Sequence, residues 1–241
     1  MTRHKGFRSM SRASKLSRRR YLTAVGSAAA VGTAGCLGGR FDDGGSVVLD
    51  EQSDQIDSDR LPYPVHGEPF PEIELPDPLA ETTVSTADDE IEGQTLIVTA
   101  FYAFCPAECL LLMGALGEAH QVLLNEGVDD AVTFLSITFD PERDTAEALE
   151  DHADMMSIDL SAGNWRYLRP EDEETAADVV TDELGIAYER DGGDSDTYEF
   201  AHQTLTFLVN PDRYVERAYR DDSPDVERVV DDVSAVADAY R

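Results

Sequence analysis

The sequence predicts one α/β domain with a mixed central sheet and helices on both faces. Three observations carry this prediction. Strand-like apolar runs alternate with helix-like segments, a hairpin pattern follows them, and an amphipathic helix closes the chain. A length of 241 residues leaves room for one such domain, a targeting segment and a linker.

Strands are predicted where apolar and β-branched residues run together. Residues 95–102 and 131–139 fit buried strands, and the sequence NWRYLR at 164–169 fits a short one. Residues 203–210 and 214–219 read as a hairpin around an Asn-Pro-Asp-Arg turn. The segment PFPEIEL at 69–75 is a candidate first strand.

Helices are predicted where apolar residues recur every three or four positions. Residues 106–125 have this spacing, with Pro106 suited to the first turn and Gly127 to the stop. A second helix is expected over 145–156, with Asp144 or Thr145 as its N-cap. Further helices are expected over 173–184 and 223–240.

Residues 1–36 have the features of an export signal. Paired arginines at Arg18 and Arg19 precede a weakly apolar stretch, 21–35, which is too short for a good transmembrane span. This pattern favours a twin-arginine signal, which would export the domain already folded. The sequence Thr33-Ala34-Gly35-Cys36 resembles a lipobox. Cys36 is therefore the predicted lipidation site, with an ordinary signal peptide as the alternative.

Lipidation would hold the mature protein on the outer face of the cell membrane. Residues 37–69 are acidic and proline-rich without a sustained period, so we expect a disordered tether there. The predicted domain then occupies residues 70–241.

Charge is distributed unevenly along the chain. Residues 1–41 carry nine Lys and Arg and no acidic residue. The remainder has ten arginines and no lysine against all 50 acidic residues, a balance near −40. Such a charge argues against nucleic acid as a partner. Because acidic residues are spread along the whole body, we read them as a solvated surface for high salt, which favours a halophilic, haloarchaeal source.

Two cysteines stand where the first buried strand gives way to a helix. Cys105 and Cys109 are four residues apart and would share one helix face. Unpaired backbone N–H groups at the helix N-terminus should lower the pKa of Cys105, whereas Glu108 opposes this. Core packing and a short-loop disulfide are alternatives, but the position favours a redox pair or a metal site. Two sulfurs cannot close a metal site, so a third ligand is required.

His202 lies just before the predicted strand 203–210, in a predicted loop that can approach the N-terminus of the first helix. Taken alone, a histidine in such a place is more often ordinary than a ligand. His120 and His152 fall in acidic helical stretches and are expected at the surface. Met155, Met156 and Trp165 are expected to pack in the interior.

Three stretches together resemble the signatures of the Sco/SenC family: FYAFCPAEC, SITFDPERDT and AHQTLTFLVNPD. The resemblance covers roughly residues 70–240. It implies a thioredoxin-like fold and a copper site formed by Cys105, Cys109 and His202. It further implies an exported or anchored metallochaperone, rather than an enzyme, that delivers copper to the copper-binding subunit of a terminal cytochrome c oxidase. We expect it to act as a monomer.

The alternative is a thiol–disulfide oxidoreductase that keeps the cysteines of an oxidase subunit reduced, with Cys105 and Cys109 as redox thiols. Related enzymes use C-x-x-C and a cis-proline, and residues 198–208 contain no proline. A peroxidase is disfavoured because Pro106 supplies no activating group.

The chain departs from the family pattern at three places. Ala201 replaces an acidic residue before the histidine, and Leu110 replaces a proline after the second cysteine. Ala103 and Phe104 stand where a hydroxyl residue is common. These changes leave the implied ligands intact and bear on affinity, redox potential and partner choice. In the middle signature, Arg143 is expected to pair with a carboxylate.

Overall fold

The computed structural model describes residues 47–52, 61–87, 91, 93–192 and 198–241. The predicted twin-arginine signal, Cys36 with its lipobox and residues 37–46 and 53–60 of the expected tether lie outside the described residues. Among the helices that are described, none has both the length and the apolar character needed to cross a membrane.

The central sheet is mixed and has five strands in the order β5-β4-β3-β8-β9. Its strands are β3 (Thr95–Phe101), β4 (Val132–Thr138), β5 (Trp165–Leu168), β8 (Thr206–Val209) and β9 (Val215–Tyr219). The first three run parallel, and β8 and β9 are antiparallel to their neighbours. The predicted buried strands, short strand and hairpin are therefore confirmed.

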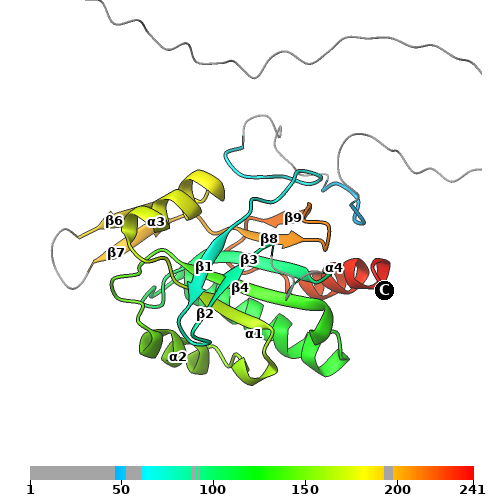
Figure 1. Ribbon diagram of the computed structural model, residues 1–241, viewed down its shortest axis with the longest axis horizontal. Coiled ribbons are helices and arrows are strands. Elements are labelled where there is room, and N and C mark those ends of the chain that lie inside the picture. Colours follow the sequence, from blue (N-terminus) through cyan, green and yellow to red (C-terminus); the bar gives the residue numbers. More distant parts are fainter. Residues whose placement is uncertain (1–46, 53–60, 88–90, 92, 193–197) are drawn as a thin grey trace, which may run out of the picture. The chain divides into compact units, whose positions relative to one another are not determined.

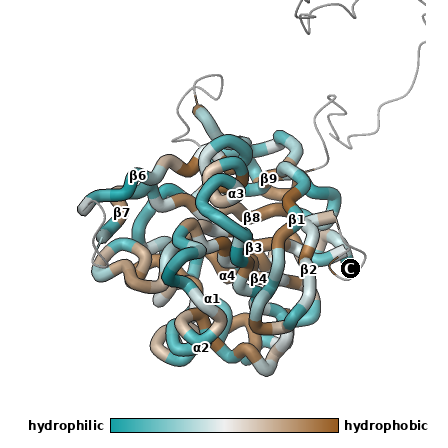
Figure 2. The backbone as a smooth tube through the Cα atoms, turned by 60° about the vertical axis from the view of Figure 1, so that its left-hand side comes forward, coloured by the Kyte–Doolittle hydropathy of each residue, from teal (hydrophilic) through white to brown (hydrophobic). Residues whose placement is uncertain are grey.

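Strands β3 and β4 are buried at every position. Continuous apolar runs of this kind are typical of parallel strands covered on both faces. Val98 in β3 lies between Leu135 of β4 and Phe207 of β8. Figure 2 shows these strands as the hydrophobic centre of the body.

Four helices surround the sheet: α1 (Glu108–Glu126), α2 (Ala146–Met155), α3 (Glu173–Ala177) and α4 (Val226–Ala239). Helices α1 and α4 pack against each other, and Figure 1 shows α3 on the opposite side of the central sheet. Helices on both faces are thus confirmed. Helix α1 stops at Gly127 as predicted, because Gly127 adopts φ 70° in the left-handed region. The predicted 173–184 helix continues beyond α3 as the π-helical segment η5 (Asp178–Glu183).

Two hairpins lie outside the central sheet. The first joins β1 (Glu74–Asp77) and β2 (Thr82–Ser85), so only the end of the candidate strand 69–75 is a strand. The second joins β6 (Tyr188–Asp191) and β7 (Glu199–His202) and was not predicted. His202 therefore ends a strand and does not lie in a loop.

Parts of the expected tether contact the domain. Val65 is buried, and the backbone N–H of Gly67 donates to the carbonyl of Val215 at 2.9 Å. Farther upstream, the carboxylate of Glu216 accepts hydrogen bonds from the backbone N–H groups of Val48 and Leu49. Ordered contacts therefore begin before residue 70.

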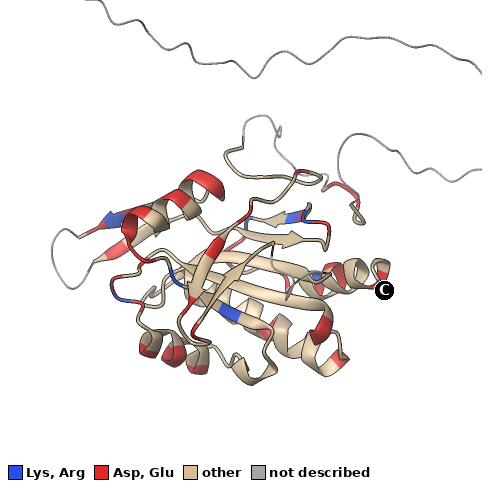
Figure 3. Cartoon of the chain, in the orientation of Figure 1, with Lys and Arg blue, Asp and Glu red and all other residues tan. Residues whose placement is uncertain are grey.

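The surface assignment of His120 and His152 is wrong, because both are buried. Nε2 of His120 bonds to Asn164 Oδ1 at 2.8 Å, and Nδ1 of His152 lies 2.9 Å from the Tyr167 hydroxyl. Each imidazole shares its helix face with apolar residues, while the acidic residues occupy the other face. Figure 3 shows that acidic residues are spread over the described helices and loops.

The expectation that both methionines pack in the interior was wrong in part, whereas one of the two predicted N-caps of α2 was right. Met155 is 58 % exposed, whereas Met156 and Trp165 do pack against the core. The N-cap of α2 is Thr145, whose side chain accepts from the backbone N–H of Ala148. Asp144 is buried, and its carboxylate accepts a hydrogen bond from the backbone N–H of Ala103.

Candidate metal centre

Cys105 and Cys109 lie between β3 and α1. The backbone N–H of Cys105 donates to the carbonyl of Tyr102 at 3.3 Å and forms the turn that leaves β3. Cys109 occupies the first turn of α1, and its backbone N–H donates to Sγ of Cys105 at 3.3 Å. Both side chains are buried free thiols. The helix start therefore presents two sulfurs, one of them already hydrogen-bonded to a helical N–H group.

His202 meets these sulfurs from the end of β7. Its Nε2 atom lies 3.2 Å from Sγ of Cys109 and 3.8 Å from Sγ of Cys105. The three donor atoms all lie within 4.8 Å of one another, and no other His, Cys, Asp and Glu group in the described residues meets this criterion.

The surroundings of His202 fix its orientation. Its Nδ1 faces the carbonyl oxygen of Gln203 at 3.2 Å. A carbonyl only accepts, so Nδ1 carries a proton, and Nε2 is the ring nitrogen that faces the sulfurs. The rings of Tyr102 and Phe139 flank the imidazole, with centroids 5.9 Å and 5.4 Å away.

The two thiols are electrostatically different. The pKa of Cys105 is lowered to about 3, and the largest cause is a hydrogen bond from Cys109. Burial acts to raise this pKa, whereas hydrogen bonds from His202 and from backbone N–H groups lower it further. Burial and the nearby Cys105 raise the pKa of Cys109. Burial acts to lower the pKa of His202, but the hydrogen bonds to Cys105 and to the Gln203 carbonyl, with the nearby negative charges, together outweigh it and the pKa is raised. Cys105 is therefore the thiolate, and Cys109 the thiol that donates to it.

The donor geometry fits a metal ion. Bonds of about 2.0 Å to nitrogen and about 2.3 Å to sulfur, arranged trigonally, would separate the nitrogen from each sulfur by about 3.7 Å. The observed nitrogen–sulfur distances of 3.2 Å and 3.8 Å lie on either side of this value. Soft thiolates with one imidazole suit Cu(I) or Zn²⁺ rather than the oxygen-preferring cations.

Comparison with known proteins identifies the family. The SCO1/SenC family model matches residues 79–238, which is more than half of the chain. The chain belongs to the SCO1/SenC family. A SCO2-like protein of Rickettsia conorii is 27 % identical over 139 residues, covering 56 % of this chain and 63 % of its own length. The chain thus spans slightly less than two thirds of that curated relative.

Solved structures show that this SCO1/SenC protein has the thioredoxin-like fold. ScoI of Bradyrhizobium japonicum, solved with copper bound, has a TM-score of 0.57 and 20 % identity over 70 % of this chain and 99 % of its own. A SCO1/SenC family lipoprotein from Bacillus anthracis has a TM-score of 0.59 and 16 % identity over 70 % and 95 %. BsSco, a member of the Sco family of cytochrome c oxidase assembly proteins with a disulfide switch, has a TM-score of 0.58 and 17 % identity over 72 % and 95 %.

The middle signature of this SCO1/SenC protein, SITFDPERDT at 136–145, holds the turn that precedes Cys105 in place. Oδ2 of Asp144 accepts from the backbone N–H of Ala103 at 3.0 Å and from the hydroxyl of Thr138. Burial raises the pKa of Asp144 to about 7. Arg143 pairs with Asp140 as expected, at 2.5 Å. The signature therefore links the end of β4 to the chain just before Cys105.

Apolar side chains are exposed beside the cysteines. Phe104 is 54 % and Leu111 53 % exposed, and Leu110 is 39 % exposed. The departures at Phe104, Leu110 and Ala201 all lie at exposed positions, so they alter the face around the centre and leave the donors in place.

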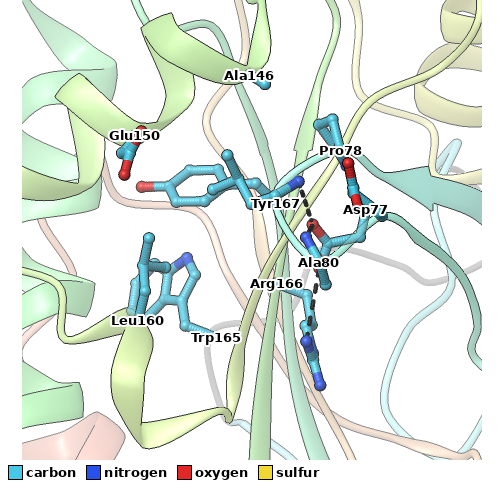
Figure 4. Close-up of a pocket in the computed structure, with 11 residues that line it drawn as sticks. Asp77, Pro78, Ala80, Ala146, Glu150, Leu160, Trp165, Arg166 and Tyr167 are labelled. Atoms are coloured by element: carbon cyan, nitrogen blue, oxygen red, sulfur yellow. Dashed lines mark hydrogen bonds and ion pairs between the residues drawn. The ribbon is translucent and has the colours of Figure 1, made fainter.

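A cavity of about 540 Å³ lies away from the candidate centre. It is lined by the β1–β2 turn and by residues of α2 and β5 (Figure 4). Asp77 and Arg166 form an ion pair at 3.8 Å within it. Neither cysteine nor His202 lines this cavity. His202 instead lines a separate cavity of about 450 Å³, together with Tyr63 and Leu205.

The residues that support His202 were not predicted. Tyr102 packs against the imidazole, and Tyr198 anchors the strand that carries it. One signal was present: in YEFAHQ at 198–203, an aromatic ring recurs at every second position, which is typical of a half-buried strand.

Proposed function

We propose that this protein is a copper metallochaperone. It holds Cu(I) as cargo on Cys105, Cys109 and His202 and passes it to the copper site of a terminal cytochrome c oxidase. The observation that carries the proposal is the meeting of two buried sulfurs and one imidazole nitrogen of a half-buried histidine. The copper-bound ScoI and the oxidase-assembly protein BsSco, both similar in fold, support it.

The donor set suits transient loading. Cys105 is ready to bind as a thiolate, whereas Cys109 releases its proton when the metal binds. Three donors leave Cu(I) open to a ligand from a partner, so transfer can proceed by exchange of one ligand at a time. The exposed side chains of Phe104 and Leu111 give such a partner an apolar contact next to the metal.

A copper titration of the reduced protein tests the proposal. We expect one Cu(I) per chain, and His202→Ala should weaken binding by at least about tenfold, because loss of even a partner that only orients a ligand costs about 10–100-fold. His66→Ala is the matched control, since the His66 side chain bonds to the backbone carbonyl of Leu49 and is not one of the three donors. Equal affinity of His202→Ala and the unaltered chain would remove the imidazole from the site.

The recipient is tested in cells. A strain lacking this protein should assemble a terminal oxidase with a depleted copper-site spectrum, and added copper should restore it in part. Normal metal loading of the oxidase in that strain would contradict the assembly role.

We extend the proposal to location and oligomeric state. Export by the twin-arginine route and lipidation at Cys36 would place a monomer at the outer face of the membrane, and the lipoprotein of similar fold supports this. Cys36→Ala should move the protein from the membrane fraction to the medium. Light scattering of the soluble domain should give the mass of one chain, and a dimer mass would overturn that part.

The lowered pKa of Cys105 also favours a second candidate function, reduction of a partner's disulfide. The Cys105 thiolate would attack that disulfide, and Cys109 would then displace the partner's dithiol and leave a Cys105–Cys109 disulfide. Rapid turnover on a model disulfide without copper would favour this function. Slow turnover with intact copper binding would favour the metallochaperone.

A further inference from the structure

The strand that carries His202 does not belong to the central sheet. In the described part of the chain, β7 pairs only with β6, and Tyr188 lies opposite His202 in the register. Figure 1 shows this hairpin beside α3 at one end of the central sheet. The position of the imidazole therefore depends on what holds the hairpin against the body.

One face of β7 is turned toward the body. Side chains alternate along a strand, so Tyr198, Phe200 and His202 point the same way. They are less exposed than Glu199 and Ala201, which lie between them. His202 stands at one end of this row and Tyr198, which is 4 % exposed, at the other.

Tyr198 is fixed to the loop that follows β4. Its hydroxyl donates to Oδ1 of buried Asp140 at 2.6 Å. Arg143 donates from Nε to the other oxygen of Asp140 at 2.5 Å and from Nη1 to the carbonyl of Tyr198 at 2.8 Å. Asp140 thus bridges the arginine of its own loop and the tyrosine of the hairpin.

The ring of Tyr198 is also held by two cations. The guanidinium carbons of Arg143 and Arg190 lie 3.6 Å and 3.4 Å from its centroid. Two guanidinium groups cannot occupy the same place above one face, so the ring lies between them. Arg190 in turn pairs with Glu142 and Glu173 at 3.3 Å and 3.0 Å. We call Tyr198, Asp140, Arg143 and Arg190 the tyrosine anchor.

Phe200 and His202, the other two residues of the row, have weaker polar contacts with the body than Tyr198 has. The backbone N–H of Phe200 reaches the Tyr102 hydroxyl at 3.4 Å, near the limit for a hydrogen bond. Phe200 and His202 otherwise contact aromatic rings and the two sulfurs. Among the described residues, the tyrosine anchor therefore supplies the short hydrogen bonds that join this hairpin to the body.

We infer that Tyr198 and Arg143 are positioning residues for the metal centre. They keep β7 seated so that Nε2 of His202 faces Cys105 and Cys109. Without the anchor, both thiols remain in place while the imidazole departs. The effect of these residues on copper binding rests on the proposed function. The position of His202 relative to the two cysteines can be measured without metal.

The experiment compares Tyr198→Phe and Tyr198→Ala with Tyr240→Phe in the full domain. Tyr240, which follows α4, donates to Asp212 between β8 and β9 at 2.8 Å, and the two form a matched tyrosine–aspartate pair away from the site. In the reduced, metal-free protein, imidazole ¹⁵N shifts and the nuclear Overhauser contact between His202 and Cys109 report seating. Tyr198→Phe should lower the ratio of seated to unseated hairpin about tenfold, because it loses a hydrogen bond to a charged group. Tyr240→Phe should match the unaltered chain.

The copper-loaded forms give the second readout. With Cu(II), Tyr198→Ala should keep the thiolate charge-transfer bands and lose the imidazole nitrogen hyperfine coupling, as His202→Ala does. An unchanged nitrogen coupling and an unchanged His202–Cys109 contact would overturn the inference. If circular dichroism shows that Tyr198→Ala is unfolded, the nitrogen coupling and the His202–Cys109 contact are measured in Tyr198→Phe, and they test the inference there. If the unaltered chain binds no copper, the proposed function fails, and the metal-free contact still decides the inference.

Discussion

The Nε2 atom of His202 lies 3.2 Å from Sγ of Cys109, although 93 positions separate the two residues along the chain. The contact joins the end of a peripheral hairpin to the first turn of α1. It converts a pair of thiols into a set of three donors.

Cys105 should react with alkylating agents as a thiolate at mildly acidic pH. Its pKa is lowered to about 3, so the reactive form is fully present above that pH and is lost only as the pH falls through it. The rate of iodoacetamide modification at Cys105 is mapped by mass spectrometry in the unaltered chain and in Cys109→Ala. In the unaltered chain this rate should be nearly constant from about pH 5 to 8. Serine would keep a hydroxyl donor at position 109, whereas Cys109→Ala removes the donor and tests the cause of the shift.

The unfolded chain is the control for this reactivity. In urea the same cysteine should follow the ordinary thiol titration near about pH 8.5. A folded chain whose rate climbs in the same way would contradict a thiolate at Cys105.

Asp144 should make the protein less stable as the pH rises from about 4 to 7. Burial raises its pKa in the folded state to about 7 from the ordinary 3.8, so the native state binds more protons in this window. Its contribution is greatest below the unfolded pKa and declines through the folded pKa, by at most about 4 kcal/mol. Asp144→Asn should remove this slope in urea denaturation measured at several pH values.

Asp151→Asn, an exposed carboxylate on α2, is the matched control for Asp144→Asn. It should leave the slope of stability against pH unchanged. Identical slopes in Asp144→Asn and the unaltered chain would show that Asp144 does not titrate in this window.

Oxidation of the cysteines should abolish copper binding. A disulfide between Cys105 and Cys109 consumes both sulfur donors, with two electrons and two protons passing to the oxidant, and leaves only an imidazole. Diamide treatment, checked by mass spectrometry, should eliminate Cu(I) uptake, and a thiol reductant should restore it. Retention of Cu(I) by the fully oxidised protein would place the copper on other residues.

Gly185→Ala should be more destabilising than Gly163→Ala. Both glycines have positive φ, 67° and 80°, so alanine costs each about 1–2 kcal/mol of backbone strain. At Gly185 a Cβ would also lie 2.3 Å from the carbonyl oxygen of Pro62, whereas none of the atoms described lies within 4 Å at Gly163. The crowding should add about 1–3 kcal/mol in chemical denaturation. Equal losses would mean that residues 61–63 do not pack there in solution.

The local sequence pattern was sufficient to predict most of the helices and strands. Strands β3 and β4 and helices α1, α2 and α4 lie within a few residues of their predicted bounds, because apolar periodicity and caps act over neighbouring positions. The β6–β7 hairpin escaped prediction because β6 is mostly exposed and polar and gains its order from contacts with the body. His120 was misplaced for a related reason, since its partner Asn164 is 44 positions away.

The sequence by itself determined the chemistry: two thiols at a strand-to-helix junction, a histidine upstream of a late strand and the signatures of the SCO1/SenC family. Only the tertiary structure decided that these groups meet, that Cys109 keeps its proton and what holds the imidazole in place. The physical reason is that spacing along the chain fixes contacts within one helix turn or one strand. Approach of β7 to α1, the burial of Cys109 and the enclosure of Tyr198 by two arginines depend on how separate elements pack.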